Sequence, residues 1–231
     1  MNSTWPNTAK YLGVRDSARK RTQAEFLSNH PKVLPLIAIG NEYVANCMFF
    51  LNRRNMSRLK HGLYICDLII SFTRTHFIAQ DLIGQGELIE AAVLIRKQME
   101  LQARLHELVK VNEFQKLIRK TPNVRELGHQ IRRLYTAYSE VAHSSDPIHL
   151  QLLGRIDVDG KQYTPFEPVY NENAIVTFQH LMVTVIEFYD WSHPFLSASY
   201  DDYDAESAQT LINDFARHFL EAFPCNPDEH V

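Results

Sequence analysis

ELIEAAVLIRKQMELQARLHELVKV, residues 87–111, is the stretch that decides the fold. Its apolar residues recur at helical spacing in two sectors, one with Leu88, Ala92, Ile95 and Met99 and another with Leu94, Leu101, Leu105 and Leu108. A helix that is apolar over so much of its circumference has to pack between at least two neighbours. The stretch therefore predicts the central helix of a helical bundle.

Helical periodicity continues on both sides of this stretch. Before it, the pattern predicts helices over 33–53 and 59–83, and Gly-Gln-Gly at 84–86 closes the second one. After it, we expect a short helix over 113–119 and a longer helix over 124–144, which Asp146-Pro147 ends. Two further amphipathic helices follow, one from about residue 171 to Pro194 and one around 211–220.

One segment has a different pattern. Apolar and polar residues alternate around Asp159-Gly160, which predicts a small β-hairpin at about 153–165, packed on the helices. The sequence thus predicts a mainly α protein, a helical bundle of five to seven helices with one small β-hairpin. We expect a polar N-terminal arm over 1–32, a single helical domain over 33–223 and a tail over 224–231.

Composition limits the possible classes of protein. The chain has 231 residues, 45% of them hydrophobic, and a formal charge of −3, which does not favour nucleic acid or an anionic membrane as a partner of the whole surface. Arg15, Arg19, Lys20 and Arg21 form one basic cluster, which is either a nucleic-acid arm or a solvated helix.

Cysteine usage and hydropathy point to the interior of the cell. Cys47, Cys66 and Cys225 are odd in number and far apart, which argues against a disulfide framework and a structural zinc site. The N-terminus lacks the apolar core of a signal peptide, and charged residues interrupt the most lipid-like run, 63–83. We expect a cytoplasmic protein with no membrane partner.

Candidate chemistry concentrates in QIRRLYTAYSEVAHSSDP, residues 130–147. On a helix, Arg132, Thr136, Ser139 and His143 fall within roughly 60° of one another. If this helix packs on the central one, Arg96 and Glu100 approach Ser139 and His143, with Tyr135 or Tyr138 lining the gap. Arginine and histidine together could hold a phosphate and move a proton, as metal-free cleavage of RNA requires.

Structural roles explain the same residues equally simply. His143 could bond to a carbonyl at the end of its helix, and Ser139 could bond back to a carbonyl one turn earlier. Arg96, Glu100 and Arg104, spaced by four residues, could form an exposed ion-pair ladder. The sequence has no phosphate-binding glycine loop, no GxSxG elbow and no HExxH pair, and we expect neither a metal site nor a cofactor.

VLIRKQMEL at 93–101 and YSEVAHSS at 138–145 resemble a family of uncharacterised helical bacterial proteins, loosely related to the HEPN superfamily. That superfamily includes RNA-cleaving toxins, defence proteins and nucleotide-binding bundles. The resemblance nominates Arg96, Glu100, Tyr138, Ser139 and His143 as site residues. Catalytic HEPN proteins carry an arginine that is followed, after four to six residues, by a histidine. In this chain Arg132 and Arg133 precede His143 by ten or more residues, and Arg125 precedes His129 by only four.

These observations lead to three hypotheses. The first is a HEPN-like module of bacterial defence or stress response, which binds a nucleotide, RNA or a protein partner at a cleft between 93–107 and 132–146, with Arg132, Tyr138 and Ser139 as binding residues. The second is a toxin-like, metal-independent ribonuclease with His143, Arg96 and Glu100 as catalytic residues. The third is a structural homodimer that associates through the aromatic-rich face of 178–195.

Overall fold

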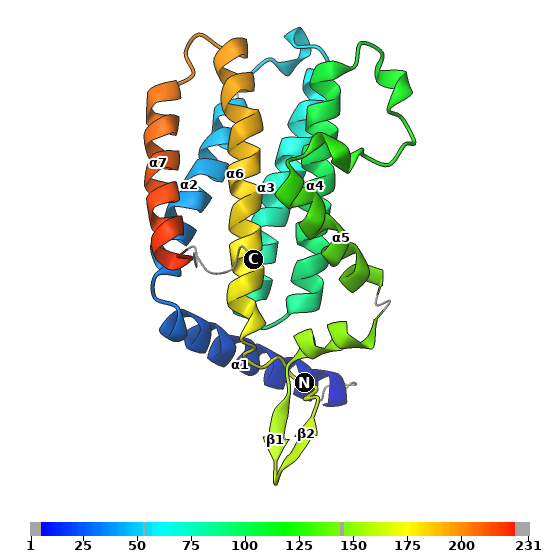
Figure 1. Cartoon of the computed structure of the whole chain (residues 1–231), viewed down its shortest axis with the longest axis vertical. Helices are drawn as coiled ribbons and strands as arrows, with labels where there is room; N and C mark the ends of the chain where they lie inside the picture. The colour runs from blue at the N-terminus through cyan, green and yellow to red at the C-terminus, as the bar shows by residue number, and fades with distance from the viewer. Residues whose placement is uncertain (1–5, 53, 144–145, 225–231) are drawn as a thin grey trace, which may run out of the picture.

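The computed structural model describes residues 6–52, 54–143 and 146–224. These residues form seven α-helices and one two-stranded antiparallel sheet (Figure 1), which confirms the predicted mainly α bundle with a small hairpin. The elements are α1 (Pro6–Asn29), α2 (Val33–Asn52), α3 (Gly62–Gly84), α4 (Leu88–Lys110), α5 (His129–His143), β1 (Ile156–Val158), β2 (Lys161–Tyr163), α6 (Asn173–Ser199) and α7 (Ala205–Ala222). Short 3-10 turns, η1 (Met56–Arg58), η2 (Phe114–Lys116), η3 (Val124–Glu126) and η4 (Pro147–Leu153), lie between them.

The helices form an upright bundle with one helix laid across its end. In Figure 1, α2, α3, α4, α6 and α7 run along the long axis, α5 leans against α4, and α1 crosses the lower end. α3 packs mainly along α4, α2 packs mainly along α7, and α4 also contacts α5 and α6. The helix over 87–111 is therefore central, as its two apolar sectors predict.

Both sectors of α4 contribute to the core. Ile95, Met99 and Leu105 are completely buried. Phe72 of α3 and Phe188 of α6 stack in the same core with ring centroids 4.3 Å apart. The aromatic side chains expected to form a dimer face at 178–195 are largely part of this core, since Phe178, Phe188 and Trp191 are buried inside the chain. The homodimer itself stays a prediction.

Several polar side chains are also buried between the helices, and they are paired across helix interfaces. The hydroxyl of Thr184 on α6 donates to Gln98 Oε1 on α4 (2.9 Å), and Gln102 Nε2 donates to the carbonyl of Thr184 (2.6 Å). His76 Nε2 on α3 lies 2.9 Å from Asn41 Oδ1 on α2, so the ring nitrogen donates. Such bonds fix the relative positions of helices, because each unpaired buried group would be costly.

Burial makes His76 a source of acid sensitivity. It lowers the pKa of His76 to about 4, below the value of about 6.5 in an unfolded chain. Below pH 6.5 the unfolded chain therefore takes up a proton that the folded chain does not, so stability is lost as the pH falls from 6.5 toward 4. We expect this group alone to remove roughly 2 kcal/mol between pH 7 and pH 5.

Urea unfolding at both pH values, for the wild type and for His76→Gln, measures this contribution. The variant removes the titrating ring, so the pH-dependent loss should be smaller by that amount. Equal losses in the two proteins would contradict the assignment.

Three predictions about the helices are wrong: one short helix is absent, one helix begins later than expected and one ends later. The short helix expected over 113–119 is only a 3-10 turn at Phe114–Lys116, and the next helix begins at His129 instead of Val124. Within 111–128, the carbonyls of Leu117 and Lys120 accept hydrogen bonds from the Arg104 side chain, and Asn123 Oδ1 caps the turn at Arg125 N. These bonds take the place of helical ones. The end of that helix at Ser144 lies outside the described residues.

The third wrong prediction concerns the end of α6, which continues through Pro194 to Ser199 instead of ending near that proline. Proline removes one helical hydrogen bond. Packing on both sides of Pro194 offsets that loss, because Trp191 and Leu196 are buried and the rings of Trp191 and Phe195 stack at 4.8 Å.

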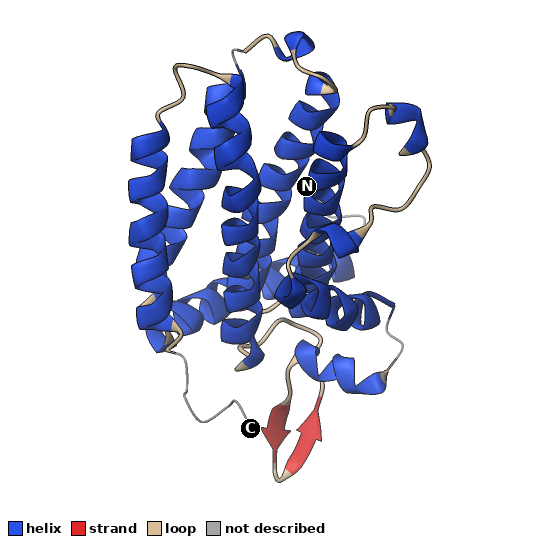
Figure 2. Cartoon of the chain, turned by 45° about the horizontal axis from the view of Figure 1, so that its top comes forward, coloured by secondary structure: helices blue, strands red, loops and turns tan. Residues whose placement is uncertain are grey.

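The hairpin is present, but it does not pack on the helices as expected. Its strands are three residues each, all six residues are exposed, and Figure 2 shows the hairpin projecting from the end of the bundle. A side-chain hydrogen bond stabilises the turn: Asp157 Oδ1 accepts from Gly160 N (2.9 Å), and Asp159 and Gly160 adopt φ of 53° and 75°.

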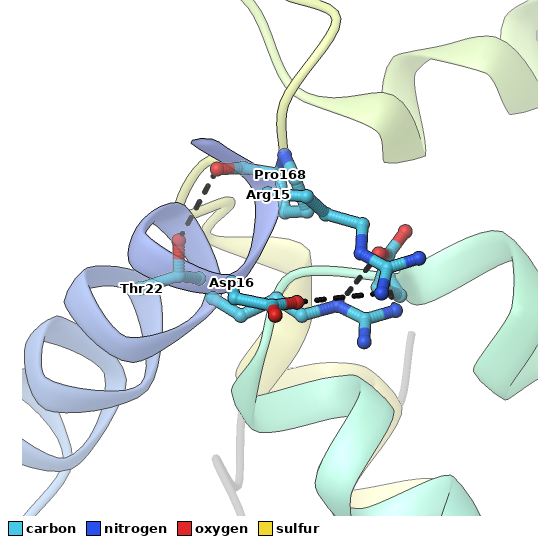
Figure 3. A network of polar contacts seen from close by, with 6 residues as sticks. Arg15, Asp16, Thr22 and Pro168 are labelled. Atoms are coloured by element: carbon cyan, nitrogen blue, oxygen red, sulfur yellow. Dashed lines mark hydrogen bonds and ion pairs between the residues drawn. The ribbon is translucent and has the colours of Figure 1, made fainter. Parts of the chain in front are cut away.

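The N-terminal segment is a helix with one buried stripe, made by Ala18, Thr22 and Phe26. Figure 3 shows how α1 is tied to the bundle. Thr22 Oγ1 donates to the carbonyl of Pro168 (3.5 Å). Arg19 donates from Nε and Nη2 to Glu87 Oε1 (3.0 and 2.8 Å). Arg15 pairs with Asp16 at 3.3 Å. Half of the basic cluster is thus neutralised by carboxylates, which favours a structural role over a nucleic-acid arm.

Among the described residues, α2 is the one helix whose length and apolar composition would allow it to cross a membrane. That finding is weak, because the core helix of a protein without a membrane segment passes the same test.

Candidate functional site

Arg96, Glu100 and Tyr135 form a polar network where α5 packs on α4. Arg96 Nη2 lies 3.2 Å from Glu100 Oε1, one helical turn away on α4. The hydroxyl of Tyr135, on α5, donates to the same carboxylate oxygen at 3.2 Å and accepts from Arg96 Nη2 at 3.5 Å. The guanidinium carbon also lies 5.4 Å from the centroid of the Tyr135 ring. We call these three residues the α4–α5 seam.

The seam is partly buried, and one of its buried polar atoms has no hydrogen-bond partner among the described residues. The side chains of Arg96 and Glu100 keep 23% and 20% of their exposure, so the ion pair is less screened than a surface pair and still reachable from solvent. Arg96 Nε is buried without a hydrogen-bond partner in the described part of the chain. Arg132 Nε, three residues before Tyr135 on α5, is also buried without a hydrogen-bond partner among the described residues.

A polar stripe on α5 continues from the seam. Ser139 Oγ donates to the carbonyl of Tyr135 (2.7 Å), and Thr136 Oγ1 donates to that of Arg132 (3.3 Å). The predicted bond from Ser139 to the previous turn is therefore confirmed. Such a hydroxyl keeps two acceptor lone pairs for another donor, but its own proton is already used.

Tyr138 does not line the gap between α4 and α5. Its hydroxyl lies 2.9 Å from His180 Nδ1 on α6, and the two rings meet edge to face at 5.7 Å. Burial raises the pKa of Tyr138 and lowers that of His180, so both groups stay neutral near pH 7. The pair joins α5 to α6.

His143 is exposed at the last residue of α5. Among the described residues, neither Arg96 nor Glu100 makes a hydrogen bond or an ion pair with it. The structure thus brings together Arg96 and Glu100 of the predicted site residues with Tyr135, one of the two tyrosines expected to line the gap, while His143 lies two turns beyond Tyr135 on the same helix. Ser144 and Ser145, which follow it in the quoted motif, lie outside the described residues.

Of the expected ion-pair ladder, only the pair of Arg96 with Glu100 is present among the described residues. Arg104 does not pair with Glu100. Its side chain is 5% exposed and lies 3.0 Å from Glu107 Oε2, and its Nη1 donates to the carbonyl of Leu117 (3.2 Å). The 111–128 segment covers this part of α4, which explains why the ladder is not exposed there.

Cationic side chains lie near the seam on both helices. Arg96 and Lys97 are on α4 and Arg132 is on α5, beside the one carboxylate of the seam, Glu100. Arg133 lies on another side of α5, where it lines a hollow with Gln179 and His180 of α6. Cationic side chains such as those near the seam attract anions.

Comparisons with known proteins give no further guide: no family model, no curated protein and no solved structure matches this chain. In the part of the chain that the structure describes, no three His, Cys, Asp or Glu side chains are grouped so that they could hold a metal ion. The arrangement at the seam offers hydrogen-bond donors and positive charge, which is the chemistry of anion binding.

Proposed function

We propose that the protein is a HEPN-like bacterial module of defence or stress response that binds single-stranded RNA along the α4–α5 seam. The observation that carries the proposal is Arg132 on α5, a half-buried guanidinium whose side chain has no hydrogen bond and no ion pair among the described residues, three residues before Tyr135 of the seam. An unpaired guanidinium of this kind can donate to a phosphate, whereas that of Arg96 already pairs with Glu100.

The length of the polar stripe favours a strand over a single nucleotide. Arg132, Ser139 and His143 lie on one side of α5, and eleven residues of helix rise about 16 Å. Several successive phosphates can follow a row of that length. RNA proteins commonly bind single strands through backbone contacts and basic side chains.

Fluorescence polarisation with a labelled 12-nucleotide RNA tests the proposal. We expect Arg132→Gln to weaken binding about ten-fold at low salt, because a lost charged hydrogen bond costs roughly 1.5 kcal/mol or more. The slope of log K against log salt should fall by about 0.7, as for one phosphate contact on a single strand.

Arg217→Gln, an equal charge change at an exposed position of α7, is the matched control and should leave binding unchanged. Equal weakening by both substitutions would mean that the overall charge of the protein, and not the seam, determines RNA binding. Absence of RNA binding at low salt would reject the proposal. Gel analysis of the same RNA covers the enzymatic alternative: cleavage that His143→Ala abolishes would replace the binding function with a ribonuclease.

A further inference from the structure

A second concave site lies on another part of the bundle, between α2 and α3. Because α2 packs mainly on α7 and α3 mainly on α4, these two helices leave a pocket of about 420 Å³ where they diverge. The 3-10 turn η1 contributes Met56, whose sulfur accepts from the hydroxyl of Tyr200 at 3.0 Å. Small-ligand sites in proteins have volumes of about 300–1,000 Å³.

The middle of this α2–α3 pocket is apolar. Met48 and Leu51 come from α2, and Ile69 and Ile70 come from α3. Asn52, Arg54 and Asn55 line the end at Leu63 and Met56. Leu63 is 67% exposed at the rim. The middle of the pocket would therefore bind an apolar body.

Among the described residues, two guanidinium groups line the pocket and no carboxylate does. Arg54 is already neutralised, because it lies 2.7 Å from Asp202 Oδ2 and donates from Nη1 to Oδ1 at 2.9 Å. It also stacks over Phe50, 4.3 Å from the ring centroid. Arg74, exposed on α3, has no hydrogen bond and no ion pair among the described residues, and it leaves one uncompensated positive charge in the lining.

The order of residues along α3 places the unpaired charge next to apolar side chains. Leu63, Cys66, Ile70 and Arg74 form one stripe, with Ile70 one helical turn from Arg74 and Leu63 about 16 Å away. A ligand with an anionic head on Arg74 and an aliphatic tail along Ile70 and Met48 matches both features. We propose that the α2–α3 pocket binds a medium-chain carboxylate, an amphiphile of the fatty-acid class.

Isothermal titration with decanoate, kept below its aggregation concentration, tests this site. We expect saturable binding of one molecule, with octanoate about ten-fold weaker because it lacks two methylene groups. Decylamine, which has the same tail and the opposite charge, should not bind. Arg74→Gln should weaken decanoate at least five-fold, whereas Arg58→Gln, an exposed arginine of η1 outside the lining, should not.

The opposite results overturn the proposal. These are no saturable binding, equal affinity for decanoate and decylamine, or equal affinity in the wild type and Arg74→Gln. Vesicles of anionic phosphatidylglycerol separate a soluble ligand from a membrane: sedimentation with vesicles and no binding of monomeric decanoate would assign the apolar α2 surface to a lipid bilayer. The site is independent of the RNA proposal, so Arg132→Gln should leave decanoate binding intact.

Discussion

Phe188→Ala is expected to lower the free energy of unfolding by about 3–5 kcal/mol, as for other large-to-small changes in a core. Phe188 is fully buried, stacks on Phe72 at 4.3 Å and meets Tyr43 edge-on at 6.3 Å. The substitution removes aromatic contacts between three helices, α2, α3 and α6, and these helices cannot collapse into the space without moving one another. Urea unfolding followed by circular dichroism measures the change.

Phe166→Ala is the matched control, because Phe166 is 70% exposed and the same atoms are removed from a surface position. Its expected effect is within about 0.5 kcal/mol. A loss below about 1 kcal/mol for Phe188→Ala would mean that this stack is not part of the stabilising core.

The core helices could be predicted from the sequence because their pattern is local. The two apolar sectors of α4 require neighbours on two sides, and α3, α5 and α6 supply them. The turn at Asp159-Gly160 could be predicted for the same reason, since its backbone geometry depends on those two residues. Whether the hairpin packs on the helices depends on the path of the chain around it, which periodicity does not contain.

The candidate site was predictable in part. The pair of Arg96 with Glu100 and the bond from Ser139 to the previous turn follow from spacing along a single helix. The role of Tyr135 depends on how α5 is rotated against α4, and the pairing of Tyr138 with His180 depends on α6, which is distant in sequence. The sequence therefore left Tyr135 and Tyr138 as alternatives for the gap, and only the packing of α5 between α4 and α6 distinguishes them.

Arg104 shows how a tertiary contact overrides a helical pattern. Its spacing from Glu100 suits an exposed ladder, yet the side chain is 5% exposed and pairs with Glu107. It also donates to the carbonyls of Leu117 and Lys120. One buried guanidinium therefore holds the irregular 111–128 segment against α4, and no window of sequence around Arg104 contains those partners.

Arg104→Met should cost about 3–5 kcal/mol, because it leaves a buried carboxylate without its partner. Glu107 is 12% exposed and also accepts from Asn123 N at 3.0 Å, so its charge would remain in a mostly dry site. The carbonyls of Leu117 and Lys120 would lose their donor as well. We expect lower stability in urea and faster proteolysis within 111–128.

The combination with Glu107→Gln distinguishes the charge from the packing. If an uncompensated carboxylate causes most of the loss, the double variant should be more stable than Arg104→Met alone, because no buried charge is left unpaired. Arg125→Met, at an exposed arginine of the same segment, controls for the changed charge and should alter stability by no more than about 0.5 kcal/mol. A double variant no better than Arg104→Met would instead assign the loss to the two carbonyls, and the role of Arg104 would then be that of a hydrogen-bond donor to the segment.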